Sequence, residues 1–164
     1  TEDDPEVFRK QVERLRQLTA KAGRDPDQLD ICISAVACVT ENEAQMEKLR
    51  DNAYLRCWGM MFLPNSDLYA QSGLGEHPMR PGWMYARKCV PHWLSRSEAM
   101  DIINRTPRES VDRVSMNGTV ERVAEKLLPY IKAGATHVLL TNAAPIAGIP
   151  DLGPQLMAAL KSAE

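Results

Sequence analysis

Apolar residues near the start of the chain recur with the three-to-four-residue period of an amphipathic helix. These residues are Phe8, Val12, Leu15, Leu18 and Ala22. Asp4 as the N-cap and Pro5 at the first helical position predict where this helix begins, and Gly23 predicts where it ends.

Residues 29–39 are predicted to form a strand, because apolar side chains occupy every odd position. The odd positions are Ile31, Ile33, Ala35, Ala37 and Val39, and the even ones are Cys32, Ser34, Val36 and Cys38. Since the even residues are smaller and partly polar, we expect them to face away from the helices. Thr40 and Glu43 match a capping box, which predicts a helix that continues to about Asn52.

The last part of the chain repeats the alternation of strand and helix. Residues 113–117 are a candidate short strand, and Thr119 after Gly118 is a good N-cap for a helix over residues 120–132 that Pro129 should bend. Residues 136–142 have the short apolar pattern of a strand buried in a parallel sheet. A loop over residues 143–153 then leads to a final helix that ends near Ala163.

Successive strand–helix units predict an α/β fold with a parallel sheet, either a barrel or a doubly wound sheet. The 164 residues suit one domain, 1–164, made of a helix–strand–helix part (1–52), an insertion or lid (53–117) and the last strand–helix units (118–164). All three tryptophans lie in the insertion. Neither a G-x-G-x-x-G motif nor a P-loop is present, so no motif supports a Rossmann-type nucleotide site or a doubly wound ligand-binding domain.

Composition narrows the function classes. A net charge of −2 and a pI near 5.9 argue against nucleic acid as a partner. No apolar run approaches the ~20 residues of a membrane span, and the acidic start of the chain is unlike a leader peptide. The missing initiator Met suggests a chain that is processed or cut from something longer. The four cysteines form no C-x-x-C pair, so we expect no metal site and reduced thiols in a cytoplasmic protein.

Two segments of the last part resemble the carboxy-terminal signature of the bacterial-luciferase-like superfamily. They are Gly118–Leu127 (GTVERVAEKL) and Ala133–Asn142 (AGATHVLLTN), which in that family form the penultimate helix and the last barrel strand. Residues 8–26 are similar to the helix and turn that enter the family's sixth strand. The segment Glu76–Met79 (EHPM) resembles the mycobacterial phthiodiolone ketoreductases, in the family's deazaflavin-dependent branch.

This resemblance implies the carboxy-terminal part of a TIM-type (β/α)8 barrel with a long insertion, because nothing corresponds to the family's first five strand–helix units. The implied function is that of an oxidoreductase: hydride transfer to a carbonyl or imine, or monooxygenation, with coenzyme F-420 or FMN. Since the missing half supplies much of the cofactor surface, we expect the isolated chain to be inactive and to bind flavin or deazaflavin weakly or not at all.

In such a fold, chemistry takes place at the carboxyl ends of the strands. The candidate cofactor-binding residues at these ends are Cys38, Gly118, Thr119, Thr141 and Asn142. The candidate substrate-binding residues, in an insertion rich in Met and aromatic side chains, are His77, Arg80, Trp83 and His92. We expect a small-molecule or lipid-like substrate, and no catalytic residue is assigned. His137 begins its strand, at the end away from the chemistry, and is expected to be structural.

The alternative is a non-catalytic half-barrel that is stable only when its open sheet edges are paired. The expected partners are further copies of the chain, as a homo-oligomer, or the missing amino-terminal half. Such an interface should bury at least ~1,000 Å².

Overall fold

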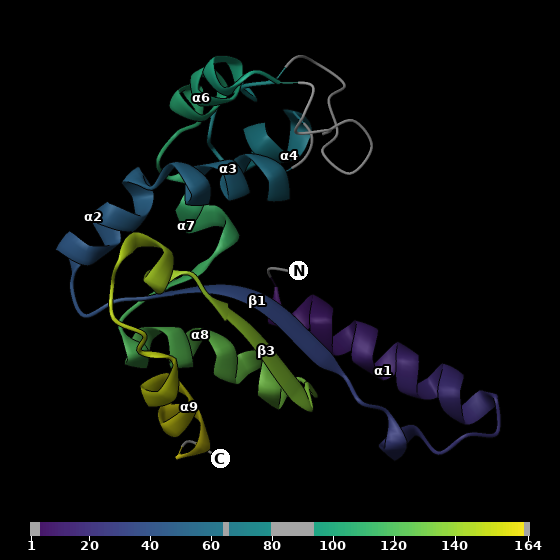
Figure 1. Ribbon diagram of the computed structural model, residues 1–164. Helices are drawn as coiled ribbons and strands as arrows, with labels where there is room; N and C mark the ends of the chain where they lie inside the picture. Colours follow the sequence, from purple (N-terminus) through teal and green to yellow (C-terminus); the bar gives the residue numbers. More distant parts are fainter. Residues whose placement is uncertain (1–3, 64–65, 80–93, 163–164) are drawn as a thin grey trace.

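The computed structural model describes residues 4–63, 66–79 and 94–162, in which helices pack around a three-stranded sheet (Figure 1). The strands are β1 (Cys32–Val39), β2 (Met116–Gly118) and β3 (His137–Asn142). Both pairs of neighbouring strands are parallel, which confirms the α/β class and the parallel sheet.

The order of the strands, β2-β1-β3, differs from that of a barrel segment, in which consecutive strands lie side by side. β3 pairs along β1 from Cys32 opposite His137 to Ala37 opposite Asn142. β2 is only three residues long and pairs with the carboxyl end of β1, on its other side. Because β3 is longer than β2, more of its residues pair with β1.

The first two helices follow the sequence pattern, with one correction. α1 (Pro5–Lys21) has Asp4 as its N-cap, whose side chain accepts a hydrogen bond from the Glu6 N–H at 2.8 Å. α2 (Glu43–Asp51) is capped by Asn42 and not by Thr40. The predicted capping box is therefore wrong, because the Thr40 N–H donates to the Gly118 carbonyl at 2.9 Å and extends the β1–β2 ladder.

α8 (Val120–Lys132) and α9 (Gly153–Lys161) follow β2 and β3, and two short 3-10 turns, η1 (Pro26–Gln28) and η3 (Ala144–Ala147), lie in the connections. Thr119 caps α8, as predicted. The helix continues through Pro129 to Lys132, and the Pro129 carbonyl still accepts a hydrogen bond from the Ala133 N–H at 2.9 Å.

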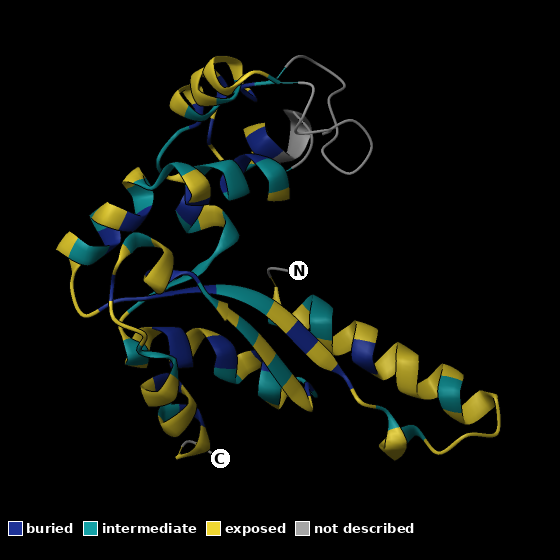
Figure 2. Cartoon of the chain, in the orientation of Figure 1, coloured by how far each residue is buried: buried dark blue, intermediate teal, exposed yellow. Residues whose placement is uncertain are grey.

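The two faces of the sheet differ as the alternation in β1 predicts. The odd residues Ala37 and Val39 pack against α8 and α9, and Ile33 packs with Tyr130 of α8. On the other face Cys32 and Ser34 are exposed, and residues of β3 alternate between exposed and half-buried (Figure 2). The prediction that the even residues face away from the helices holds for Cys32 and Ser34, but it is wrong for Cys38, because α2 covers that end of the face and packs Met46 and Leu49 against it.

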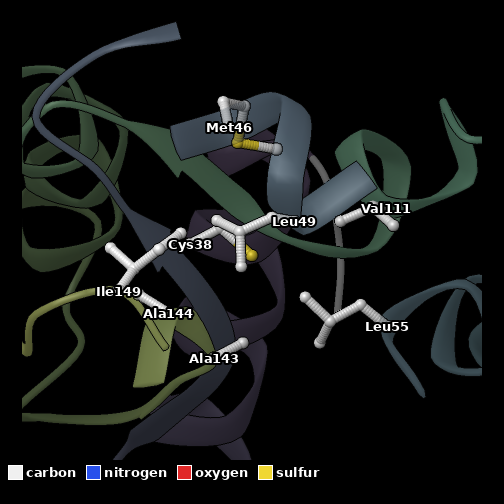
Figure 3. Packing of buried hydrophobic residues seen from close by; sticks show 8 residues of the cluster. All are labelled: Cys38, Met46, Leu49, Leu55, Val111, Ala143, Ala144 and Ile149. Atoms are coloured by element: carbon white, nitrogen blue, oxygen red, sulfur yellow. The ribbon is translucent and has the colours of Figure 1, made fainter. Parts of the chain in front are cut away.

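The described residues of the middle part are mostly helical and lie beyond the carboxyl ends of the strands (Figure 1). It contains α3 (Ala53–Phe62), α4 (Ser66–Gln71), α6 (Arg96–Arg105) and α7 (Ser110–Val114). A buried cluster joins it to the sheet, α2 and the turn after β3 (Figure 3). The cluster consists of Cys38, Met46, Leu49, Leu55, Val111, Ala143, Ala144 and Ile149.

Over the described residues, no helix is long and apolar enough to cross a membrane. Cys32 and Cys38 are free thiols, the Cys57 Sγ lies 3.6 Å from the Met61 sulfur, and Cys89 lies outside the described ranges. In this same part of the chain, no three His, Cys, Asp or Glu side chains gather as metal ligands.

Candidate functional site

A groove of about 400 Å³ lies at the carboxyl ends of β1 and β2, where a parallel sheet of this kind binds its ligands. Its walls come from the ends of these strands, from α2, from α7 and from the first two turns of α8. The lining residues are Thr40, Asn42, Glu43, Met46, Arg50, Asp112, Asn117, Gly118, Thr119, Arg122 and Lys126.

One wall of the groove is an ion-pair network centred on Arg50. Its guanidinium donates two hydrogen bonds to the Asp112 carboxylate of α7, at 2.8 and 3.1 Å, and it also pairs with Glu43 and Glu47 of α2. Hydrogen bonding to Asp112 is the largest cause of the raised pKa of Arg50. Arg50 thus joins α2 to α7. Because three carboxylates surround its guanidinium, the positive charge is already compensated and would attract a bound anion only weakly.

The opposite wall carries two cations of α8, Arg122 and Lys126, which form no ion pair with any described carboxylate. The Lys126 ammonium donates to the Asn117 carbonyl at 2.8 Å and to the Asn117 side-chain oxygen at 3.3 Å. Burial, and then the nearby charge of Arg122, lower the pKa of Lys126. Both effects disfavour the charged ammonium, the nearby Asp112 carboxylate offsets them in part, and an anion bound beside the ammonium would offset them further.

Gly118, the last residue of β2, lets the chain turn tightly into α8. Its φ is +131°, and a Cβ added there would lie 3.1 Å from Cβ and Cδ of Arg122. Thr119 then begins α8, and its side chain accepts a hydrogen bond from the Arg122 N–H at 3.4 Å. The first turn of α8 and the two cations give the groove a positive wall, which suits a phosphate or carboxylate.

The candidate cofactor-binding residues are divided by the fold. Gly118 and Thr119 line the groove. Cys38 is fully buried in the cluster of Figure 3, and burial raises the pKa of its thiol, so it does not face a ligand. Thr141 and Asn142 end β3 on the other side of β1 and do not line the groove. The Asn142 amide donates to Asp151 at 2.6 Å, and its oxygen accepts from the Ala144 N–H at 3.2 Å.

His77 is the one candidate substrate-binding residue within the described ranges, and Arg80, Trp83 and His92 lie outside them. The His77 ring is buried and meets the edge of Tyr69 with ring centroids 4.8 Å apart. Its Nδ1 accepts from the Met79 N–H at 3.1 Å, and its Nε2 lies 3.4 Å from the Met60 carbonyl. Burial lowers the pKa of His77. These contacts hold a neutral imidazole in the packing between α3 and the segment after α4.

Other described residues of the insertion form a core of their own. Met60 and Ile102 are buried between α3 and α6, with Met61 and Met79 packed against them. The sequence analysis missed Arg122 and Lys126 as residues of the groove. Arg122 and Lys126 are four residues apart and follow directly after the Gly118-Thr119 turn, a spacing that places two cations on one helix face at a helix start.

Comparison with known proteins identifies the family of the chain. The family model of luciferase-like monooxygenases matches residues 2–137. The chain belongs to the luciferase-like monooxygenase family. This family member is similar to a phthiodiolone/phenolphthiodiolone dimycocerosates ketoreductase of Mycobacterium sp. (strain JLS), with 21% identity over 122 residues. The similar region covers 74% of the chain but only 31% of the ketoreductase. Monooxygenases and ketoreductases are both oxidoreductases.

Proposed function

We propose that the chain is the carboxy-terminal part of a flavin- or deazaflavin-dependent oxidoreductase, and that the groove holds the anionic end of the cofactor. The observation that carries this proposal is the positive wall at the carboxyl ends of β1 and β2, in a member of the luciferase-like family. FMN and coenzyme F-420 both carry phosphate, and either would supply the hydride chemistry once bound.

The residues of the groove fit such a group. The N–H groups at the start of α8, the Lys126 ammonium and the Arg122 guanidinium can all donate to phosphate oxygens. Gly118 keeps the approach to the helix start free of a side chain. Ser34 and Thr141, which are exposed on the open face of the sheet, are further polar groups that the cofactor ring could contact.

We propose further that the chain is half of a (β/α)8 barrel, and that its insertion covers a small-molecule or lipid-like substrate. Support comes from the 31% of the ketoreductase that the chain matches and from the exposed, partly apolar sheet face that a barrel would enclose. The strand order β2-β1-β3 requires β2 to pair differently when the remaining strands are present. The groove alone provides the anion contacts and not a ring pocket, so the isolated chain should bind the cofactor weakly and be inactive.

A titration of the chain with FMN, followed by amide NMR, tests the proposed site. FMN should shift the amides of Gly118, Thr119 and Val120 at millimolar concentration, and riboflavin, which lacks the phosphate, should not. The Arg122→Ala/Lys126→Ala variant should lose the shifts, and Arg14→Ala/Arg16→Ala, with two exposed cations of α1 removed, should keep them. Equal shifts with riboflavin, or none with FMN, would contradict the anion site. Micromolar binding would contradict the half-barrel proposal.

The second candidate function is a non-catalytic half-barrel that acts by association. The observation that favours it is the exposed edge and face of β3, where Leu139 is 60% exposed. Restored turnover when the chain is combined with an amino-terminal half of a family member would support the enzyme, and stable association without turnover would support the alternative.

A further inference from the structure

The Asn117 side chain lies between a carboxylate and an ammonium group of the groove. On one side its amide nitrogen donates to the Asp112 carboxylate at 3.1 Å and to the Asp112 carbonyl at 3.3 Å. On the other side the Lys126 ammonium donates to the amide oxygen at 3.3 Å and to the Asn117 carbonyl at 2.8 Å. One neutral side chain therefore bridges two opposite charges, and all three residues line the groove.

The neighbours of the Asn117 amide determine which way it points. Its nitrogen also donates to the Ser115 carbonyl at 3.4 Å, so three acceptors surround that end of the amide. The other end faces an ammonium, which has donors and no acceptor. The reverse orientation would place the amide oxygen against a carboxylate and two donors against each other. The amide therefore fits in one orientation, with its nitrogen toward Asp112 and its oxygen toward Lys126.

The two charges that Asn117 separates are compensated to different degrees. The Asp112 carboxylate already accepts two hydrogen bonds from the Arg50 guanidinium. Among the residues that the structure describes, the Lys126 ammonium donates only to the two neutral oxygens of Asn117. An ammonium has three N–H groups, so one of them is left to donate to a ligand. The positive charge of Lys126 is thus directed but not neutralised.

Without the Asn117 amide, Lys126 and Asp112 would attract each other directly. Burial and then the charge of Arg122 lower the pKa of Lys126, and the charge of Asp112 already acts in the opposite direction. The lysine side chain is a flexible four-carbon stem, so its ammonium can reach a carboxylate that now lies just beyond one amide group. Such an ion pair would compensate the ammonium charge and weaken its attraction for a bound anion.

We propose that Asn117 is a positioning residue of the groove, whose amide keeps Lys126 from pairing with Asp112 and so keeps that positive charge available to a bound phosphate. The inference rests on the proposed anion site. The side chain at this position must be neutral and must donate at one end and accept at the other, which an amide does and a carboxylate does not. The three residues lie within positions 112–126, so their contacts come from α7, β2 and α8 and do not depend on further strands.

An NMR titration of the Lys126 side chain without any ligand tests the separation of the charges. Asn117→Ala retains the backbone acceptor and should raise the pKa of Lys126, because the ammonium then pairs with Asp112. In an Asp112→Asn background the same substitution should cause no such rise. Asn104→Ala, which removes an exposed amide of α6, is the matched control and should leave the pKa unchanged. An unchanged or lower pKa in Asn117→Ala, or an equal rise in both backgrounds, would overturn the proposal.

A titration with inorganic phosphate, followed by the amide shift of Thr119, tests the consequence for binding. Asn117→Ala should weaken phosphate binding about tenfold, the effect of losing one charged hydrogen bond. In the Asp112→Asn background it should change the affinity little, whereas a merely structural role would weaken binding equally in both backgrounds. Circular dichroism should show the same fold for all variants.

The two titrations separate this inference from the proposed function. Phosphate binding that is equally tight in the wild type and in Asn117→Ala would overturn the role of Asn117 and leave the anion site in place. A wild-type chain that binds neither phosphate nor FMN would refute the anion site and, with it, the inference.

Discussion

Gly59 of α3 lies so close to α7 that a single methyl group should destabilise the chain. A Cβ at position 59 would lie 2.2 Å from Oγ of Ser110, 2.6 Å from its Cβ and 3.0 Å from its backbone carbonyl carbon. The last distance involves the main chain, so a rotamer change of Ser110 cannot relieve it and α7 must shift. Ser110 is fully buried, which leaves it little space to move.

For Gly59→Ala, the clash with the main chain of Ser110 places the cost of overpacking in the upper part of its usual range, at about 2–3 kcal/mol. The higher helix propensity of alanine offsets at most ~1 kcal/mol of this loss in unfolding free energy. The net loss of unfolding free energy should be about 1–2 kcal/mol, which lowers Tm by about 2–8 °C in a chain of this length. Thermal unfolding followed by circular dichroism measures it.

Ser110→Gly removes the two closest atoms, so the Gly59→Ala/Ser110→Gly double variant should lose less stability than the sum of the single variants. Ser110→Ala alone should be neutral or stabilising, because the buried Ser110 hydroxyl has no hydrogen-bond partner among the described residues. A Tm for Gly59→Ala at or above that of the wild type would refute the close contact of α3 and α7.

Two further predictions concern the insertion. Burial holds the pKa of His77 below its usual 6.5, so the unfolded chain binds more protons than the folded one below that pH. The contribution of the neutral His77 to the unfolding free energy should be fully present above about pH 6.5 and should be lost as the pH falls through the pKa of the folded state. Unfolding free energies measured in urea between about pH 7 and pH 5 should therefore decrease less with falling pH in His77→Gln than in the wild type. The Arg56 guanidinium donates to the carbonyls of Thr106 and Asn104 at the end of α6, at 3.0 and 2.9 Å. Arg56→Ala should therefore lose about 1–3 kcal/mol in chemical unfolding, whereas Arg16→Ala on the exposed face of α1 should match the wild type.

Local patterns predicted the elements, because the forces that form them act over a few residues. The alternation in β1 identified its helix-facing side, and Asp4 and Thr119 were correct N-caps. Thr40 was assigned wrongly because its ladder partner, Gly118, lies 78 residues away in the sequence. The position of β2 on the outer side of β1 depends on the same long-range pairing, which periodicity does not encode.

Residues of the site could be predicted from the sequence only where the residue types themselves indicate a particular backbone conformation. Gly118 and Thr119 are such a case, since a glycine before a capping threonine indicates a tight turn into a helix. Cys38 was a candidate because it ends a strand, but whether a strand end is open depends on what packs over it. Here Leu49 and Val111, from two separate helices, cover the thiol.

The short β1–β2 ladder also determines how freely the segment between these strands can vary in length. The entropy lost when a loop closes grows only with the logarithm of its length, so doubling or halving the connection between Thr40 and Gly118 changes the free energy of closure by about 0.6 kcal/mol. That is comparable with a single ordinary hydrogen bond. Loop closure therefore sets almost no limit on the length of the insertion, and the segments of it that lie outside the buried cluster of Figure 3 can be longer or shorter while the sheet stays the same.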